Sequence, residues 1–254
     1  MSDKVPISIV LLVKNEEKYI QKTLESVKWA QDIIIADDES TDRTVEIARQ
    51  YTDRICTKKM DIEGAHRNWA YSLAECDWIL SLDGHEEVTK ELADELARFV
   101  VEEKELIAGS IPIRIYIGKH WARYGGWYPA NKVRLLKKGE FKYDDKANVH
   151  PRAFYRMPPR YLKGDIIHWG YENFEQVFNS INRQTTLEAE KMFESGKKFS
   201  AFTMCRKVIH RFFKSFILKG GIRGGVMGFM VGVFVAVYPL YSYLKLWELE
   251  NERN

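Results

Sequence analysis

The sequence predicts an α/β fold with a mostly parallel sheet and flanking helices, followed by a C-terminal helical region that associates with a membrane. Short apolar runs alternate with segments of helical periodicity over the first 90 residues, as in βαβ units with right-handed crossovers. Residues 224–244 form a run of 21 uncharged, mostly apolar residues. We therefore expect an α/β domain over 1–200, with halves 1–90 and 91–200, and a helical region over 201–254.

The composition is that of an ordinary globular protein. Of 254 residues, 45% are hydrophobic and 30% are charged, and the net charge of +3 is too small to indicate a nucleic-acid-binding protein. The three cysteines, Cys56, Cys76 and Cys205, are too few and too widely spaced for a disulfide framework or a zinc site. We expect them to be reduced thiols facing the cytoplasm. The apolar run 7–13 is too short for a signal peptide and predicts a strand.

Each segment of the first half has its own pattern. Residues 7–13 (ISIVLLV) are continuously apolar and rich in β-branched side chains, which is typical of a strand buried on both faces. Ser40 or Thr41 stands where it can cap a helix over residues 45–48. The other predicted strands lie at 32–36, 54–57 and 78–82, and the other predicted helices at 16–29, 65–74 and 89–101.

Polar clusters follow three of the predicted strands. They are Lys14-Asn15-Glu16, Asp37-Asp38 and Asp83-Gly84-His85. Ligands bind beyond the carboxyl ends of parallel strands, so we expect the three clusters at one edge of the sheet. The sequence contains neither G-x-G-x-x-G after the first strand nor G-x-x-x-x-G-K-[ST]. A metal ion is therefore expected to hold any phosphates, with Arg67 as an additional cation.

Several motifs occur together in a specific order and spacing. They are Val13-Lys14-Asn15-Glu16, Asp37-Asp38-x-Ser40-x-Asp42, Arg67-Asn68-Trp69-Ala70, Leu80-Ser81-Leu82-Asp83, Gly126-Trp127-Tyr128-Pro129, Val133-Arg134-Leu135, Asp144-Asp145, Asn148-Val149-His150 and Leu244-Lys245-Leu246-Trp247-Glu248. With these motifs the chain resembles family 2 glycosyltransferases with the GT-A fold, and most closely the bacterial lipopolysaccharide-core glucosyltransferase group. The resemblance covers nearly the whole chain and implies a nucleotide-binding half at 1–90 and an acceptor half at 91–200.

The resemblance also implies which residues bind the donor. Glu16 and Asp38 would contact the ribose and base of a nucleotide-sugar, and Arg67 would lie near its diphosphate. The full set implied for the nucleotide-sugar is Val13, Asn15, Glu16, Asp37, Asp38, Arg67 and Asp83.

In this resemblance Asp83 begins the acidic metal motif. The group usually has Asp-Ala-Asp-Glu, whereas this chain has Asp83-Gly84-His85-Glu86. An imidazole nitrogen is a good ligand for Mn²⁺ and a poor one for Mg²⁺, and an Asp-x-His motif is also found in the GT-A polypeptide N-acetylgalactosaminyltransferases. We therefore expect a divalent metal, with Mn²⁺ favoured over Mg²⁺, held by Asp83 and His85, with His150 as a candidate third ligand. The alternative is a sugar-nucleotide fold that has lost catalysis.

The acceptor half has to supply a base, because inverting transfer requires a carboxylate that takes the proton of the attacking hydroxyl. Where the group commonly shows His-Glu, this chain has His150-Pro151, so Asp144 and Asp145 are the candidate bases. The alternative for this pair is a solvated turn, and for His150 an acceptor contact or a structural histidine. Two ring side chains are expected to line the acceptor pocket or else to pack structurally: His168 and Trp127.

The C-terminal region has the pattern of a membrane-associating segment. Residues 206–219 alternate basic with apolar side chains, which suits an anionic membrane surface, and 224–244 is long enough to span a bilayer of about 30 Å. Pro239 is expected to kink or break it, so a re-entrant hairpin and a soluble helical subdomain are the alternatives. Basic residues on the N-terminal side predict the cytoplasmic face of the inner cell membrane. Three glycines at four-residue spacing lie on one helix face, which lets helices approach closely: Gly224, Gly228 and Gly232. This face predicts a possible homo-oligomer.

Together these patterns predict an inverting glycosyltransferase that moves a sugar from a nucleotide-diphosphate sugar to a lipid-linked or lipopolysaccharide-type saccharide acceptor. A UDP-sugar is expected through the resemblance, and no nucleic acid is expected as a partner. One alternative is transfer to a polyprenyl phosphate, an anion that needs cations more than a base. The cations available for it are Arg114, Arg123, Lys132 and Arg134. The other alternative is a non-catalytic nucleotide-sugar-binding or assembly protein.

Overall fold

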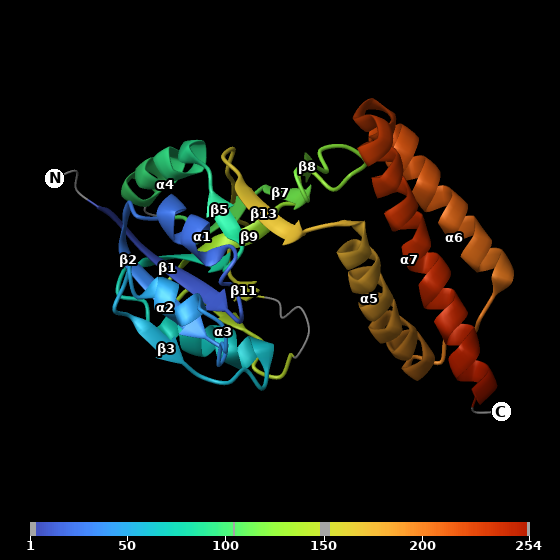
Figure 1. Cartoon of the computed structure of the whole chain (residues 1–254), viewed down its shortest axis with the longest axis horizontal. Coiled ribbons are helices and arrows are strands. Elements are labelled where there is room, and N and C mark those ends of the chain that lie inside the picture. Colours follow the sequence, from blue (N-terminus) through green and yellow to red (C-terminus); the bar gives the residue numbers. More distant parts are fainter. Residues whose placement is uncertain (1–3, 104, 148–152, 253–254) are drawn as a thin grey trace. The chain divides into compact units, whose positions relative to one another are not determined.

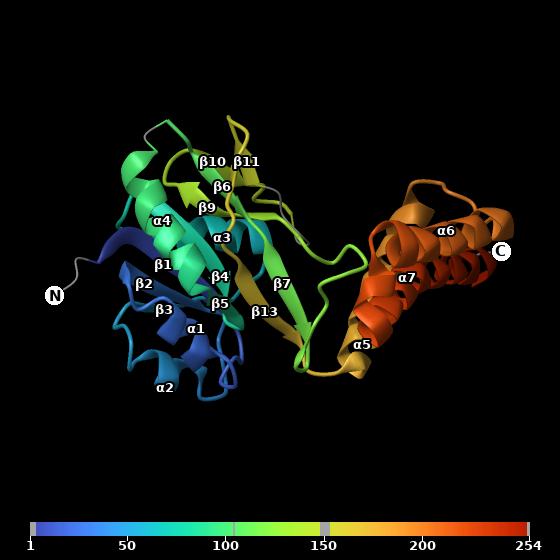
Figure 2. The same cartoon turned by 90° about the horizontal axis from the view of Figure 1, so that it is seen from above.

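The chain forms two compact units in a computed structural model, which describes residues 4–103, 105–147 and 153–252 (Figures 1 and 2). The first unit contains residues 1–113 and 131–168, and the second contains 114–130 and 169–254. The chain passes from one unit to the other within two strands, β7 (Ile113–Ile117) and β13 (Ile166–Tyr171). The division differs from the predicted boundary at residue 200, because 169–200 belong to the second unit.

The first unit is built on a seven-stranded sheet with the order β12-β6-β9-β4-β1-β2-β3. Four neighbouring strands are parallel: β1 (Val5–Val13), β2 (Ala30–Asp37), β3 (Ile55–Thr57) and β4 (Trp78–Asp83). The other three are β6 (Ala108–Ile111), β9 (Lys132–Lys137) and β12 (Arg160–Tyr161). Of these, β9 runs antiparallel to both β4 and β6. The predicted α/β fold with a mostly parallel sheet is confirmed.

Four helices connect these strands: α1 (Ile20–Ser26), α2 (Thr44–Ala48), α3 (Glu63–Ser72) and α4 (Lys90–Glu102). Both α3 and α4 contact the central strand β1, in which Ile7, Ile9 and Leu11 have no exposed surface. Burying each of these side chains contributes about 1.5–3 kcal/mol relative to leaving it in water. The apolar run that predicts a strand therefore forms the centre of the core.

The helix starts differ in part from expectation. Thr89 caps α4 by accepting a hydrogen bond from the Leu92 amide. The prediction that Ser40 or Thr41 caps α2 is wrong, because this helix begins after Arg43, which makes no side-chain cap. The Asp42 carboxylate accepts from the Thr44 amide instead, at 2.9 Å.

The strand register decides where the polar clusters lie. Val13 at the end of β1 is opposite Asp37 at the end of β2, and Leu12 is opposite Asp83 at the end of β4. Three parallel strands therefore end at the same edge of the sheet. The expectation that the clusters after these strands share one edge is confirmed.

The remaining strands form two smaller sheets. One has the order β5-β13-β7-β8, with β5 at Glu86–Val88 and β8 at His120–Trp121, and the other pairs β10 (Phe141–Tyr143) with β11 (Ala153–Tyr155). Within the first unit, β13 pairs antiparallel with β5 and sets His168 opposite Glu86. This pairing carries a histidine of a late segment to the end of β4.

The second unit is mainly helical. Its helices are α5 (Phe174–Glu194), α6 (Ala201–Phe213), a π-helix (Lys214–Leu218), a 3₁₀ turn (Gly221–Gly224) and α7 (Gly225–Glu252). α7 packs against both α5 and α6 (Figure 1) and continues through Pro239. By length and composition, Gly221–Glu252 is sufficient to cross a membrane, and 33% of its most apolar window is buried within the chain.

The glycine row consists of Gly224 at the end of the 3₁₀ turn and of Gly228 and Gly232 on α7, and it packs inside the second unit. A Cβ on Gly228 would lie 1.8 Å from the Gly221 carbonyl oxygen, one on Gly232 would lie 3.3 Å from the Phe212 ring, and one on Gly224 would lie 3.3 Å from Tyr124. The row therefore lets segments of the same chain approach closely. The prediction that it offers a free face to a second copy is wrong.

We expect Gly228→Ala to destabilise the chain by roughly 1–3 kcal/mol, because the added methyl group would overlap a backbone carbonyl that cannot rotate away. Gly232→Ala is the matched control on the same helix face, where only the Phe212 and Phe216 side chains have to shift. Thermal denaturation measures both variants. Equal melting temperatures for the two would contradict the proposed packing of Gly228 on Gly221.

Candidate active site

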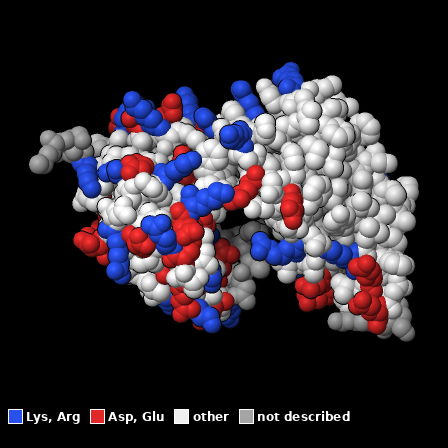
Figure 3. Space-filling view, in the orientation of Figure 1, with Lys and Arg blue, Asp and Glu red and all other residues white. Residues whose placement is uncertain are grey.

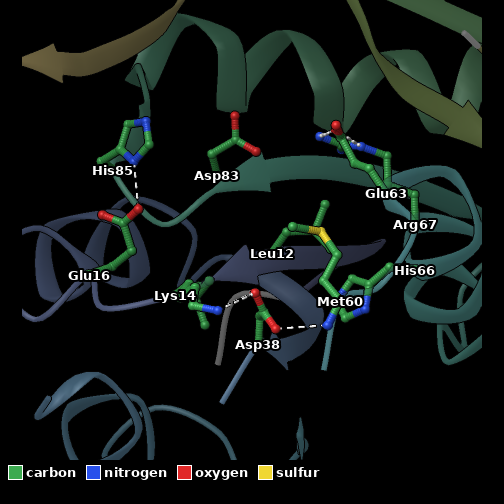
Figure 4. A pocket seen from close by; sticks show the side chains of 11 residues that line it. Leu12, Lys14, Glu16, Asp38, Met60, Glu63, His66, Arg67, Asp83 and His85 are labelled. Atoms are coloured by element: carbon green, nitrogen blue, oxygen red, sulfur yellow. Dashed lines mark hydrogen bonds and ion pairs between the residues drawn. The ribbon is translucent and has the colours of Figure 1, made fainter. Parts of the chain in front are cut away.

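A hollow of about 220 Å³ opens at the edge where β1, β2 and β4 end (Figure 4). Its walls come from the ends of β1 and β4, the segments after β2 and β3, and the start of α3. Five of the seven residues predicted to bind a nucleotide-sugar line it, together with a predicted metal ligand: Val13, Glu16, Asp38, Arg67 and Asp83, with His85. The rest of the lining is Leu12, Lys14, Met60, Glu63 and His66.

The other two predicted donor residues shape the loops around the hollow. Asn15, whose φ of 55° lies in the left-handed region that asparagine tolerates, accepts a hydrogen bond from the Thr41 amide at 2.8 Å. Its own amide donates to the Ser40 hydroxyl. The buried Asp37 carboxylate accepts from the Ser40 amide and the Thr57 hydroxyl. Asn15 therefore ties the segments after β1 and β2 together, and Asp37 ties the end of β2 to the end of β3.

Asp38 is a buried carboxylate with two donors. The Met60 amide and the Lys14 ammonium each donate to it at 2.8 Å (Figure 4). Burial acts to raise the pKa of Asp38, but these two hydrogen bonds outweigh it and hold the pKa below its usual value. Asp38 is therefore charged at neutral pH and faces the hollow as a hydrogen-bond acceptor.

We expect Asp38→Asn to destabilise the chain by about 1–2 kcal/mol at neutral pH, because hydrogen bonds to a charged acceptor are stronger than those to an amide. The folded pKa of Asp38 lies below its unfolded value of about 3.9. Its charge thus stabilises the fold above that pH, and the contribution is lost as the pH falls through the folded pKa. Urea denaturation of both proteins from pH 7 to about pH 3 should show the difference shrinking toward acid. A difference that grew toward acid would contradict this account.

Glu16 and His85 form a second hydrogen-bonded pair at the hollow. The Glu16 carboxylate lies 2.8 Å from His85 Nδ1 (Figure 4). Burial acts to lower the pKa of His85, but Glu16 outweighs it and raises the pKa overall. The His85 ring also meets the His168 ring edge to face, with centroids 4.7 Å apart. His168, a predicted acceptor residue, in turn lies 3.2 Å from Glu86.

Arg134 joins the end of β4 to β9 by two ion pairs. Its Nη2 donates to Asp83 and to Glu86, both at 2.8 Å, and Glu86 has no exposed surface. Burial acts to raise the pKa of Asp83, but Arg134 and Arg67 hold it well below its usual range. The same guanidinium keeps the pKa of Glu86 lowered against its burial. Both carboxylates are therefore charged.

A second hollow, of about 380 Å³, adjoins the first and shares Glu63, Arg67 and Asp83 with it. Its further lining includes two more cations, Lys132 and Arg134. Arg67 is held in place by Glu63 at 2.8 Å and by the Tyr71 hydroxyl at 3.1 Å. Carboxylates on the first side and cations on the second make this edge suited to a ligand with a polar end and an anionic end.

Two buried nitrogens at these hollows have no hydrogen-bond partner among the described residues: His66 Nδ1 and Arg134 Nε. His66 lines the first hollow and Arg134 the second. Unpaired buried polar groups are costly, so each is a candidate ligand contact. The sequence alone indicates no role for His66, and it indicates Arg134 only as a cation for an anionic acceptor. A charged residue inside the apolar run Val133-Arg134-Leu135 is the signal that could have found it.

Two of the predicted metal ligands, Asp83 and His85, line the first hollow and each keeps one side-chain atom that no described residue engages. Within the part of the chain that the structure describes, no three His, Cys, Asp or Glu side chains form a metal-holding group. Asp83 has one oxygen on Arg134, and His85 has Nδ1 on Glu16, which leaves Asp83 Oδ1 and His85 Nε2 as donors. Two protein ligands plus phosphate oxygens are a common arrangement for such ions. The third predicted ligand, His150, lies outside the described residues, as does Pro151.

The predicted bases lie in an exposed turn after β10. The Asp145 carboxylate is engaged by Asn68 at 2.6 Å and by Lys142 at 2.7 Å. The Asp144 carboxylate accepts from the Lys146 amide. Neither residue lines the two hollows. Trp127, predicted to contact the acceptor, belongs to the second unit and stacks on Phe234 with centroids 5.8 Å apart.

Comparison with known proteins identifies the family to which this chain is similar. The model of the family described as "Glycosyl transferase family 2" matches residues 8–160. A Rickettsia typhi protein named as an uncharacterized glycosyltransferase is 29% identical over 84% of this chain and 77% of its own length. The lipopolysaccharide core biosynthesis glycosyltransferase LpsC of Rhizobium meliloti is 24% identical over 98% of this chain and 94% of its own.

Among solved structures, TarS residues 1–349 of S. aureus in complex with UDP aligns with 97% of this chain and 91% of that chain, at 13% identity and a TM-score of 0.46. The family model spans more than half of the sequence and covers the strands and helices that build both hollows. The predicted resemblance is confirmed: the chain belongs to glycosyl transferase family 2 and has the GT-A-like α/β fold.

Proposed function

We propose that the chain is an inverting glycosyltransferase that moves a sugar from a UDP-sugar to a lipid-linked or lipopolysaccharide-type saccharide acceptor. The observation that carries the proposal is the pair of adjoining hollows at the strand ends. Glu16 and Asp38 on one side offer acceptors for the hydroxyls of a nucleoside, and the cations on the other side suit a diphosphate. The relative named for lipopolysaccharide core biosynthesis supports this acceptor class, and UDP follows from the family resemblance.

The proposed reaction places negative charge where the cations lie. The acceptor hydroxyl oxygen bonds to the anomeric carbon from the face opposite the diphosphate and loses its proton to a carboxylate base, while the bond from that carbon to the β-phosphate oxygen breaks. Arg67, Lys132 and Arg134 line the hollow in which the leaving diphosphate would gain its charge. Asp83 and His85 would hold a divalent metal, which would supply further electrophilic stabilisation of the leaving diphosphate. The imidazole nitrogen favours Mn²⁺ over Mg²⁺ at that site.

Asp144 is the better base of the predicted pair. The hydrogen bonds from Lys142 and Asn68 lower the pKa of Asp145 and weaken it as a base. Among the described residues, the Asp144 carboxylate accepts a hydrogen bond only from the Lys146 amide. We expect Asp144→Asn to lower kcat by about a hundredfold or more and Asp145→Asn to lower it far less, with UDP binding unchanged in both. Steady-state kinetics with the accepted sugar acceptor measures this. Full activity of Asp144→Asn would exclude it as the base.

A polyprenyl phosphate is the second candidate acceptor, and the cations favour it. Lys132 and Arg134 stand beside the proposed diphosphate position, and an anionic acceptor needs no base. The other two predicted cations, Arg114 and Arg123, lie over the Trp121 ring in the second unit. Competition between undecaprenyl phosphate and a core oligosaccharide separates the two acceptors. Turnover with the phosphate alone would replace the saccharide in the proposal.

The second unit is proposed to hold the enzyme on the cytoplasmic face of the inner membrane. Much of its surface in view is free of charged side chains (Figure 3). Exposed apolar side chains cover α6, the two turns after it and the start of α7: Phe202, Ile209, Phe213, Ile217, Leu218, Ile222, Val226 and Phe229. Exposed basic residues stand among them: Arg206, Lys214, Lys219 and Arg223. Apolar and basic groups together suit an anionic lipid surface.

Calorimetric binding of UDP, GDP and a panel of UDP-sugars to the detergent-purified chain tests the proposal. We expect UDP to bind at least about tenfold more tightly than GDP, and one UDP-sugar to be turned over when an acceptor is added. Failure of every nucleotide to bind would overturn the proposed function. Binding without turnover across acceptors and divalent metals would instead identify a non-catalytic nucleotide-sugar-binding protein.

A further inference from the structure

The second unit contains a hollow of its own, of about 230 Å³, between α5, α6 and α7. Its walls are mostly apolar and aromatic, and include Trp127, Val177, Ile181 and Phe234. All of its lining residues belong to the second unit. The hollow is therefore separate from the two at the strand ends, and neither the donor nor the leaving group accounts for it.

Tightly packed side chains keep this hollow open. Val177 and Phe234 are each 1% exposed, so their positions are fixed by the core of the unit. Trp127 stacks on Phe234, and Phe178 meets the same ring edge to face at 5.2 Å. Rings locked in this way cannot easily turn into the space. The hollow is thus a preformed apolar surface of the kind that binds hydrocarbon.

Arg211 of α6 supplies the one charged group in the lining. It is exposed, and its guanidinium lies over the Tyr238 ring at 5.8 Å. Among the described residues, no carboxylate lies within ion-pair distance of it. A guanidinium with its forked donors unpaired at the rim of an apolar hollow is suited to a phosphate group.

We propose that this hollow binds the lipid end of the acceptor, with the hydrocarbon chain against Trp127 and Phe234 and the adjoining phosphate on Arg211. This inference rests on the proposed function and deepens it, because it names a phosphate-bearing lipid as the acceptor class. An apolar cavity of about 150 Å³ holds benzene, so the present hollow has room for roughly nine carbon atoms at that packing. It would take the end of the chain nearest the phosphate, and the rest of the chain would stay in the bilayer.

The lining distinguishes this ligand from general membrane lipid. The exposed apolar and basic strip on α6 and its following turns is an open surface, on which any anionic lipid can lie. The hollow is a recess between three helices, and its lining carries a single cation. It therefore selects a ligand that has one phosphate next to one hydrocarbon chain.

Binding of radiolabelled farnesyl phosphate, farnesol and inorganic phosphate to the full chain in detergent tests the inference. We expect farnesyl phosphate to bind at least about tenfold more tightly than farnesol and than inorganic phosphate, because a charge-assisted hydrogen bond is added to apolar burial. Arg211→Gln should remove the difference between farnesyl phosphate and farnesol. Gln184→Trp, which fills the hollow from its wall on α5, should weaken both by at least about tenfold.

Matched variants on the same helices serve as controls. Arg206→Gln removes an exposed charge from α6 outside the hollow, and Asn179→Trp adds an exposed indole to α5 outside it. Both should bind the lipids as the unaltered chain does. Equal losses in Arg211→Gln and Arg206→Gln would overturn the inference in favour of general surface electrostatics, and unaltered binding in Gln184→Trp would overturn the hollow as the site.

UDP binding, measured on every variant, separates this inference from the proposed function, and thermal denaturation of every variant checks that it folds. Loss of UDP binding is not expected from any change in the second unit. If the chain binds farnesyl phosphate through Arg211 but binds no nucleotide, the proposed transferase function is overturned and the lipid site is retained. A chain that binds UDP but not farnesyl phosphate would overturn the lipid site alone.

Discussion

Replacing Arg134 by methionine is expected to cost about 3–5 kcal/mol of unfolding free energy and to abolish transfer. Arg134 is 5% exposed, and Glu86 beside it is completely buried. Removing one partner of a buried ion pair leaves the other charge without compensation, which is costlier than losing the pair as a whole. Arg134 also lines the hollow proposed for the leaving diphosphate. Urea denaturation and a transferase assay measure the two effects separately.

The double variant Arg134→Met with Glu86→Gln separates stability from chemistry. Because it removes the buried negative charge together with the positive one, it should recover at least about half of the lost stability while remaining inactive. Lys132→Met is the control for loss of a cation at an exposed position of the same strand, and should change stability by less than about 0.5 kcal/mol. If Arg134→Met alone is as stable as the unaltered chain, Arg134 and Glu86 do not form a buried ion pair that stabilises the fold.

The sequence predicts the sheet edge of this site well, and the reason is physical. Parallel strands that are buried on both faces read as nearly continuous apolar runs, as in 7–13 and 78–82, each of which contains a single serine. Their carboxyl ends coincide because the connections between them are helical crossovers. The positions of Glu16, Asp38 and Asp83 at one hollow follow from this topology together with the family resemblance.

The partners of these residues could not be predicted in the same way. Arg134 reaches Glu86 from a strand 48 positions later in the sequence, and His85 meets Glu16 across 69 positions. No local periodicity encodes such pairs. The glycine row on α7 has a four-residue spacing that suits contact with another chain as well as with Gly221, and only the tertiary packing decides between them. The sequence likewise does not decide whether Asp144 and Asp145 act as bases or form a solvated turn.

Removing the divalent metal is expected to weaken UDP binding by about a hundredfold, since the metal would neutralise a diphosphate beside the Asp83 carboxylate. Calorimetry with Mn²⁺, with Mg²⁺ and with a chelator should show the order Mn²⁺, Mg²⁺, chelator from tightest to weakest. His85→Ala should weaken Mn²⁺-supported binding by at least about tenfold, because loss even of an outer contact to a metal costs about 10–100-fold in affinity.

The variant His85→Asp decides what the imidazole does. As a metal ligand His85 contributes a nitrogen, so a carboxylate in its place should keep metal-supported UDP binding and shift the preference from Mn²⁺ toward Mg²⁺. As a partner of Glu16 alone, at 2.8 Å, it contributes a positive charge, and a second carboxylate there would repel Glu16 and weaken binding with every metal. A shift of preference would establish the metal site at the end of β4. UDP binding that weakens equally with every metal would show that His85 serves only as the partner of Glu16. Arg67 and Arg134 would then be the groups that stabilise the leaving diphosphate.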